Sequence, residues 1–355
     1  MNIDLNLKIK QNIANMLIQQ GRSIDVSEYL FEQDCHYLIM EISQNENCRA
    51  KSSIINLYNE YVVNYRYNCY RNLFKYLYDH SIPYAVIKGA VLSYSIYQNP
   101  YWRISSDLDI IIEPTNVDGV KKYLEREGFF QGRIVNNQVK EYSRENILFY
   151  NFFSHQEAPY IKQTSNPMCP YISIDLNTNI MWGECNIQVN ISDLLVDVEC
   201  IEINGVMTNK LRRELEFIVL CLHHYKDINS LFLLFTKGII LSLFSDIYYF
   251  VKNNPMDTIV LEKYMNELSV GQYVYYCLHY TNLLFCDDQI NLLMELFSHY
   301  CDPLLLESYG LNNDERKKWR ISFFERMNRY HLKKYLTENL DTKDFEKIQQ
   351  NMKYL

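Results

Sequence analysis

The stretch "YAVIKGAVLSYSIYQNPYWRISSDLDIIIEP", residues 84–114, decides the fold, because two short apolar runs flank a helix-like segment in it. "YAVIKG" is typical of a short buried strand, "AVLSYSIYQ" of a helix and "DLDIIIE" of a second strand. Two aspartates, Asp107 and Asp109, stand one residue apart at the start of the second apolar run. This strand–helix–strand order predicts a sheet with α/β connections.

The alternation continues beyond this stretch. "NVDGVKKYLEREG" predicts a helix closed by Gly128, while "FFQGRIV", "ILFYNFF" and "YISIDLN" predict further strands. Residues 1–80 are predicted to be helical, and Ser81 and Pro83 end the last of these helices. Beyond about residue 206 we expect strands to give way to helices, first in "LRRELEFIVLCLHHYKD".

Composition limits the class of protein. The 355 residues are 48% hydrophobic, enough for two or three domains with a sizeable core. The net charge of −8 argues against bulk nucleic-acid binding, although a local basic groove stays open. The apolar stretch 230–250 contains Lys237 and Asp246, so it predicts a buried helix pair rather than a membrane span. The 10 cysteines form no CxxC pair and residues 1–21 lack a signal-peptide pattern, which predicts a cytoplasmic protein with reduced thiols.

The paired aspartates are candidates for a metal site. Alternate side chains of a strand share a face, so Asp107 and Asp109 project together, away from Leu108 and Ile110. Like charges at this spacing are unfavourable unless a cation lies between them, and carboxylate oxygens suit Mg²⁺. A solvated strand end is the alternative explanation.

A third carboxylate, Asp175, lies in the predicted strand "YISIDLN", where Ile172 and Ile174 alternate with polar residues. A neighbouring strand could bring it beside the first two. Three carboxylates at one end of a sheet can hold two metal ions about 3.5–4 Å apart, an arrangement that serves phosphoryl and nucleotidyl transfer.

Lys88 and Gly89 supply a candidate phosphate site. Gly89 lies where the first strand turns into the helix, so free backbone N–H groups and the positive helix end can face a phosphate, and Lys88 adds charge. An ordinary turn is the alternative. The chain has neither GxxxxGK[ST] nor a GxGxxG after a strand, so the sequence offers no support for a P-loop or a dinucleotide site.

Taken in order, these motifs resemble the DNA polymerase beta-like nucleotidyltransferase superfamily. The chain is most similar to an uncharacterised nucleotidyltransferase family of bacterial proteins, through "IKGAVL", "WRISSDLDIII", "LEREGFF", "IDLN" and "LCLHHYKD". The resemblance covers roughly residues 80–255. It implies an α+β fold: a nucleotidyltransferase-type mixed sheet with flanking helices over residues 81–205, an N-terminal helical segment (1–80) and a C-terminal helical domain (206–355).

The resemblance also implies roles for individual residues. Asp107, Asp109 and Asp175 would be catalytic and hold Mg²⁺ or Mn²⁺, while the nucleotide would contact Lys88, Gly89, Arg103 and Ser106. Two positions depart from the pattern. Better studied superfamily members have Gly-Gly or Gly-Ser in place of Lys88-Gly89, and Asn177 stands where many closer relatives have a histidine, whose role is lost or reassigned here.

Three further residues could support the site residues from behind or lie on the side where the acceptor binds. His223 and Lys226 lie near the end of the predicted helix that starts around Lys210, and Asp246 is similarly placed in the family pattern. The alternatives are cations that complement a helix C-terminus and a buried structural ion pair.

The sequence therefore favours a metal-dependent nucleotidyltransferase. It would move a nucleoside monophosphate from an NTP, ATP by default, to an acceptor and release pyrophosphate. The acceptor could be a small molecule, a peptide, a protein or an RNA end, because all would use the same core. The rival hypothesis is a non-catalytic nucleotide-binding or partner-binding protein that retains the fold.

Overall fold

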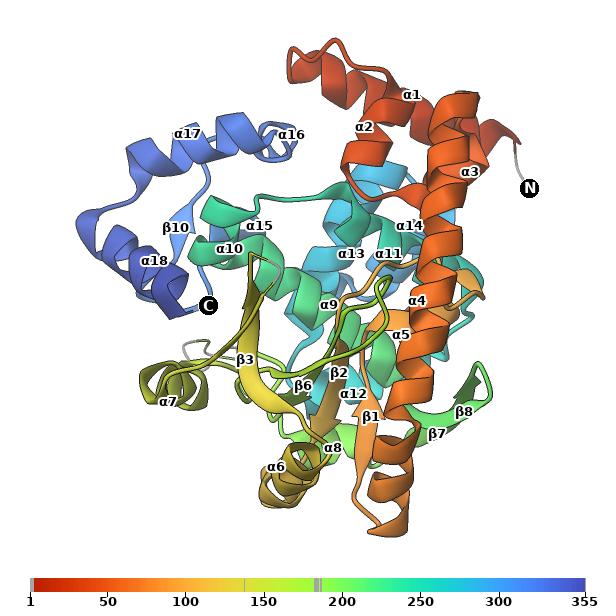
Figure 1. The fold of residues 1–355 in the computed structure, drawn as a ribbon. Helices are drawn as coiled ribbons and strands as arrows, with labels where there is room; N and C mark the ends of the chain where they lie inside the picture. Colours follow the sequence, from red (N-terminus) through yellow and green to blue (C-terminus); the bar gives the residue numbers. More distant parts are fainter. Residues whose placement is uncertain (1–2, 137, 182–184, 186, 355) are drawn as a thin grey trace. The chain divides into compact units, whose positions relative to one another are not determined.

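The computed structural model describes residues 3–136, 138–181, 185 and 187–354; residues 1–2 and 355, at the ends of the predicted helical segments, lie outside them. The chain divides into two compact units, Ile55–Val219 and a second formed by Met1–Ile54 with Leu220–Leu355. Both boundaries fall near or inside long helices, α4 (Glu46–Asp79) and α9 (Arg213–Asn229) (Figure 1). Each unit is described by itself.

The unit Ile55–Val219 is built on an eight-stranded mixed sheet with the order β4-β3-β5-β6-β2-β1-β8-β7. β2 pairs in parallel with β6 and β1 with β8, whereas the other neighbours are antiparallel. The strands are β1 (Tyr84–Val86), β2 (Leu108–Ile112), β3 (Phe130–Val135), β4 (Gln138–Glu141), β5 (Tyr160–Gln163), β6 (Tyr171–Asn177), β7 (Val198–Ile203) and β8 (Val206–Leu211).

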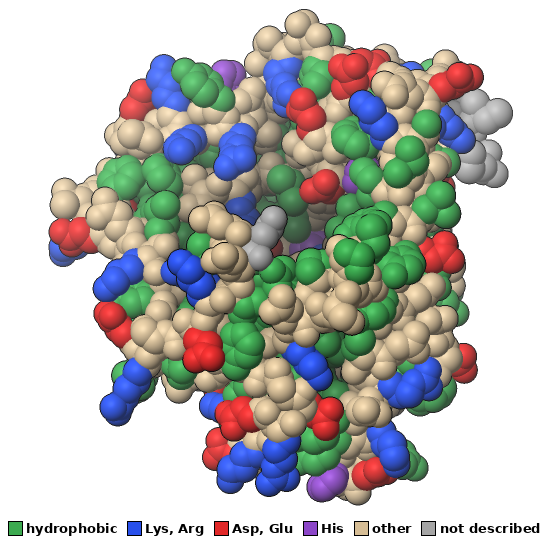
Figure 2. Space-filling model, viewed as in Figure 1, with side chains coloured by type: hydrophobic (Ala, Val, Ile, Leu, Met, Phe, Trp, Pro, Cys, Tyr) green, Lys and Arg blue, Asp and Glu red, His purple; other side chains and the backbone are tan. Residues whose placement is uncertain are grey.

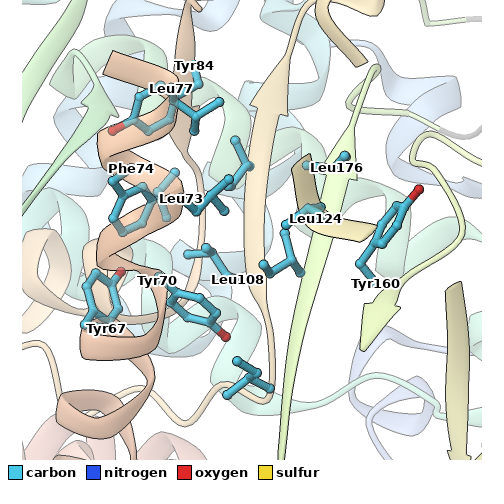
Figure 3. Packing of buried hydrophobic residues seen from close by; sticks show 14 of the residues in the cluster. Tyr67, Tyr70, Leu73, Phe74, Leu77, Tyr84, Leu108, Leu124, Tyr160 and Leu176 are labelled. Atoms are coloured by element: carbon cyan, nitrogen blue, oxygen red, sulfur yellow. The ribbon is translucent and has the colours of Figure 1, made fainter. Parts of the chain in front are cut away.

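Helices flank this sheet, and α4 supplies much of its core. Tyr70 and Phe74 of α4 pack against the face of the sheet that carries Leu108 (Figure 3). Because strand side chains alternate, this packing leaves Asp109 on the opposite face. The other helices of the unit are α5 (Gly89–Tyr97), η1 (Pro114–Asn116), α6 (Val117–Arg126), α7 (Arg144–Phe153) and α8 (Ile191–Leu195).

The strands predicted from "YAVIKG", "DLDIIIE", "FFQGRIV" and "YISIDLN" are confirmed as β1, β2, β3 and β6. The strand predicted from "ILFYNFF" is wrong, because this segment belongs to α7. A seven-residue aromatic run is ambiguous by periodicity, and the local signals decide for helix. Ser143 accepts a hydrogen bond from the backbone of Asn146, and Glu145 lies in the first turn.

The expectation that strand structure ends by about residue 206 is also wrong. β7 and β8 form a hairpin, and β8 pairs with β1 in the centre of the sheet. Asn204 and Gly205 connect the two strands with φ of 50° and 70°, the backbone that a two-residue turn requires. The Asn-Gly pair was the sequence signal for this hairpin, although the helical periodicity that follows obscured it.

The other unit is mainly helical. The predicted buried helix pair is confirmed as α10 and α11, and the described residues contain no helix long and apolar enough to cross a membrane. A short ladder of β9 (Ser308–Tyr309) and β10 (Lys317–Lys318) interrupts the helices. The helices are α1 (Ile3–Gln19), α2 (Val26–Glu32), α3 (His36–Ile42), α10 (Leu231–Thr236), α11 (Leu241–Asn253), α12 (Thr258–Glu267), α13 (Gly271–Phe285), α14 (Asp288–Leu296), η2 (Ser298–Tyr300), α15 (Pro303–Leu306), α16 (Phe323–Arg326), α17 (Arg329–Asn339) and α18 (Thr342–Tyr354).

Candidate active site

Three central strands of the sheet bring acidic side chains and a lysine to one face. β2 and β6 run parallel with Asp109 directly opposite Asp175. β1 and β2 are antiparallel, and the backbone N–H of Ile87 donates to the carbonyl of Asp109 over 3.2 Å, so Lys88 follows at the same place. Asp107 immediately precedes β2. Asp107, Asp109, Asp175 and Lys88 are called the carboxylate site below.

Lys88 and Asp109 form the closest ion pair of this site. Lys88 Nζ lies 2.8 Å from Asp109 Oδ1, and the two side chains are 16% and 4% exposed. Burial by itself would lower the pKa of Lys88, but the attraction of Asp109, with smaller contributions from Asp107 and Asp175, raises it above the usual value. The lysine therefore carries its charge against the acids.

The other two carboxylates remain in excess. Burial raises the pKa of Asp107, and repulsion from Asp109 raises it further, against the opposing effects of Lys88, Ser105 and Arg103. The pKa of Asp175 is well above its usual range for the same two reasons, burial first and then Asp109. Three acids thus share one ammonium group, and burial and mutual repulsion both oppose ionisation of Asp107 and Asp175.

The donor chemistry fits a hard divalent cation. Asp175 Oδ1 is buried and accepts no hydrogen bond from the described residues, although Gln156 Nε2 donates to the other oxygen over 2.7 Å. A buried carboxylate oxygen without a partner is unfavourable unless a cation approaches it. Among the described residues, however, no three His, Cys, Asp or Glu side chains already stand in the arrangement of a metal site. The ligand types therefore suit Mg²⁺, while Lys88 occupies Asp109 Oδ1.

Gly89 permits the close packing of the turn beside these acids. It has φ of +61°, and a Cβ on it would lie 3.3 Å from Ser105 Oγ. That hydroxyl donates to Asp107, with 3.0 Å to the carbonyl oxygen and 3.1 Å to Oδ1. Arg66 Nη1 in turn donates to the carbonyl of Ser105. A side chain at residue 89 would therefore disturb the group that orients Asp107.

The two other predicted phosphate residues, Arg103 and Ser106, lie in the segment that leads into Asp107. Ser106 is exposed next to Asp107. Arg103 is partly exposed, its backbone N–H donates to Ser93 Oγ over 2.9 Å, and its charge lowers the pKa of Asp107. The predicted roles of both toward a nucleotide stay predictions.

Sequence reasoning missed two residues that hold the acids, Ser105 and Gln156. Ser105 stands next to the predicted Ser106, and only the turn geometry distinguishes them. Gln156 lies outside any strand and reaches Asp175 because it forms an isolated bridge with Asn177. Asn177 itself, two residues from Asp175 and hence on the same face, directs Nδ2 at Asp109 Oδ1 over 3.4 Å.

His223, Lys226 and Asp246 lie in the predominantly helical unit, on α9 and α11. Asp246 Oδ2 is 3.6 Å from Nε2 of the fully buried His224, whereas His223 Nε2 is 3.5 Å from Asp227 Oδ2. His224, the second histidine of the pair, is therefore a partner of Asp246. Lys226 is buried. Their predicted roles in the site or with the acceptor stay predictions.

A second buried acid lies in the same unit as the carboxylate site. Glu216 of α9 is 2% exposed, and Ser95 Oγ of α5 lies 3.0 and 2.8 Å from its two carboxylate oxygens. Lys210 Nζ of β8 is 3.1 Å from Glu216 Oε2 and also pairs with Glu199 at 3.2 Å. We call Glu216, Ser95 and Lys210 the Glu216 cluster. It connects α5, β8 and α9, and both oxygens of its buried acid are hydrogen-bonded.

Comparison with known proteins gives one extensive match. The family described as "Uncharacterised nucleotidyltransferase" matches residues 66–286, more than half of the chain. No curated protein matches. The crystal structure of an antigenic nucleotidyltransferase-like protein from Paracoccidioides brasiliensis matches with 12% identity and a TM-score of 0.33, over 59% of this chain and 91% of that chain.

Proposed function

The chain belongs to the family of uncharacterised nucleotidyltransferases, and from this premise we propose that it transfers a nucleoside monophosphate from an NTP to an acceptor with release of pyrophosphate. The observation that carries this proposal is the pairing of Asp109 with Asp175 on one sheet face beside Asp107, with more acid than nearby lysine can neutralise. ATP is the proposed donor and the cytoplasm the proposed location.

The protein's contribution is to position and neutralise charge. Asp107, Asp109 and Asp175 would hold Mg²⁺ or Mn²⁺, which when bound supplies charge neutralisation on the phosphates and a more acidic attacking group. Gly89 allows the turn between β1 and α5 to come close to a phosphate, because no side chain projects there.

Three further side chains would border the triphosphate. Lys88 and Arg103 bring positive charge beside the acids, and Ser106 is exposed next to Asp107. The attacking group would be oriented by the acids on the sheet face, which the strands hold at fixed places in the register.

The proposed acceptor is a hydroxyl or similar group on a small molecule, peptide, protein or RNA end. Bulk nucleic acid is a poor fit, since the net charge is −8. Figure 2 shows Lys and Arg side chains interspersed with Asp and Glu side chains on the face in view.

One observation favours a second candidate, a nucleotide-binding protein without transfer activity. Lys88 Nζ lies 2.8 Å from Asp109 Oδ1, so one oxygen of a proposed metal ligand already has a cationic partner. If that ion pair persisted in the presence of nucleotide and Mg²⁺, the acids would serve binding and not chemistry.

The test is pyrophosphate release by the full chain with NTP, Mg²⁺ and a cell extract, followed by a mass search for nucleotidylated species. Calorimetric titration with each NTP, with and without Mg²⁺, separates binding from chemistry. Binding without pyrophosphate release would select the second candidate, and the absence of both would reject both. Asp193→Asn, at an exposed aspartate of the same unit, is the matched control for variants of the site.

A further inference from the structure

Lys88 occupies one carboxylate oxygen of Asp109, a predicted metal ligand. Its Nζ is 2.8 Å from Asp109 Oδ1, and the lysine side chain is largely buried. An ammonium group and a divalent ion both satisfy carboxylate oxygens, but at the same distance the divalent ion is attracted twice as strongly to each acid. The two therefore compete for one position.

The acids cannot move to accommodate both cations, whereas the lysine can. Asp109 is fixed within β2, its backbone bonded to Ile87 and its register set against Asp175 of β6. Lys88 instead lies between β1 and α5, next to the turn at Gly89, and carries its charge on a flexible four-carbon stem. Its ammonium group can be redirected by rotation of side-chain bonds without a change in the sheet.

One ammonium group is insufficient for this site. Asp109 lies opposite Asp175 and two residues from Asp107, whereas Lys88 Nζ forms its ion pair with Asp109. Within the part of the chain that the structure describes, Asp175 Oδ1 has no hydrogen-bond partner. A cation of higher charge would neutralise more of the carboxylate charge and could bind the unpartnered oxygen. The site should therefore favour a divalent cation over the ammonium group of Lys88.

We propose that Lys88 is the resident counter-ion of the metal-free site, that a divalent cation displaces it from Asp109, and that the released ammonium group then contacts the triphosphate. This inference rests on the proposed function and adds a mechanism to it: metal binding makes the lysine available, so metal and NTP bind with positive coupling. Lys88 thus contacts the triphosphate only after the metal has displaced it from Asp109.

The direct test is Mn²⁺ binding to the full chain without nucleotide, measured by calorimetry and by the electron paramagnetic resonance of free Mn²⁺. Lys88→Met removes the competitor, so its Mn²⁺ affinity should rise by roughly tenfold, the equivalent of ~1.4 kcal/mol for one charged contact. Lys88→Arg keeps a charge with a stronger bidentate fork and should bind Mn²⁺ more weakly than Lys88→Met. Lys75→Met removes a lysine from an equally short 2.8 Å pair in α4 and should change nothing.

The second measurement is the coupling between Mn²⁺ binding and nucleotide binding. In the parent, saturating Mn²⁺ should increase the affinity for a non-hydrolysable NTP analogue more than it does in Lys88→Met, because the variant has no ammonium group to release. A purely structural lysine would leave this coupling unchanged.

The outcomes separate the two hypotheses. A parent that binds Mn²⁺ while Lys88→Met binds it no more tightly overturns the displacement and leaves the proposed nucleotidyl transfer standing. A parent that binds no Mn²⁺ rejects the metal-dependent function and the displacement with it. If Lys88→Met does not fold, Lys88→Arg decides, since Mn²⁺ affinity equal to or above that of the parent contradicts competition.

Discussion

Two buried clusters of the same unit combine carboxylates with a lysine, yet they differ in how completely the acids are satisfied. In the Glu216 cluster both oxygens of the acid are hydrogen-bonded, by Ser95 and by Lys210. In the carboxylate site three acids share Lys88, and Asp175 Oδ1 is buried without a partner. Burial of an acid is unfavourable in both places, but only the first supplies the compensation from within the chain.

The direction of the pKa shift does not distinguish the two clusters, whereas its causes do. Burial raises the pKa of Glu216, and Lys210 and Ser95 are the next largest influences, both opposing the rise. For Asp175 the next largest influences after burial are Asp109 and Asp107, which add to the rise. Carboxylates that the fold holds together despite their mutual repulsion indicate a ligand-binding site. A buried acid whose oxygens are both hydrogen-bonded indicates a structural role.

The largest effect should come from Asp109→Asn. If the carboxylate site performs transfer, this variant should lose activity on the order of 10³-fold, because one charged ligand and the partner of Lys88 are lost together. The measurement is the rate of pyrophosphate release with NTP and Mg²⁺. Asp193→Asn is the control, and an Asp109→Asn rate close to that of the parent would remove the distinction between the clusters.

The Glu216 cluster should respond in stability instead. Glu216→Ala leaves Ser95 and Lys210 without the buried acid and should cost about 3 kcal/mol, the scale for breaking a buried ion pair. Urea unfolding followed by far-ultraviolet circular dichroism measures it, with the exposed Glu202→Ala as control. Mn²⁺ affinity of the folded variant should equal that of the parent; a parallel loss of Mn²⁺ binding would mean that the two clusters act as one.

Period-two alternation explains how much of the carboxylate site follows from the sequence. It places Asp109 opposite the core residues of β2, and it does the same for Asp175 in β6. It cannot supply the contact of Lys88 with Asp109, because that depends on the antiparallel register of β1 and β2. Gln156 lies 19 residues from Asp175 in an irregular segment, where no periodic signal exists.

What the sequence did not predict lies in segments with irregular backbone or with an ambiguous hydrophobic pattern. The hydroxyl that bonds Asp107 belongs to Ser105, which the sequence pattern did not single out, because turn geometry has no period. The segment of α7 is apolar on most sides, and a cap at Ser143 rather than its hydrophobic pattern identifies the helix. The fold was predictable where one face of an element is polar and the other buried.

A smaller effect should come from Gly89→Ala, with Gly205→Ala as a matched control. Both glycines have positive φ, +61° and +70°, so alanine should cost about 1–2 kcal/mol of backbone strain at either. A Cβ at residue 205 meets nothing within 4 Å, whereas one at residue 89 lies 3.3 Å from Ser105 Oγ. Both variants should therefore show a similar decrease in melting temperature. The rate of pyrophosphate release should fall more in Gly89→Ala than in Gly205→Ala. Equal rates would show that Ser105 does not orient Asp107.

The smallest expected effect is a pH dependence of the free energy of unfolding that arises from Glu216. The folded-state pKa of Glu216 is raised above its usual 4.5, so the folded protein binds the proton more tightly than the unfolded chain does. The contribution of this proton to the free energy of unfolding is fully present below about pH 4.5. It is lost as the pH rises through the folded-state pKa of Glu216.

Glu216→Gln cannot titrate, which isolates this contribution. The parent should therefore be most favoured relative to Glu216→Gln at low pH, and its advantage should decline as the pH rises from 4.5 through the folded pKa of Glu216. Urea midpoints of both proteins over this range measure the difference, and the other acids cancel because they are common to both. Mn²⁺ should leave the difference unchanged, since the buried oxygens of Glu216 already have partners. A difference that grows with pH would mean that Lys210 stabilises the ionised acid more than burial disfavours it, and a difference that Mn²⁺ abolishes would assign Glu216 to the metal rather than to the fold.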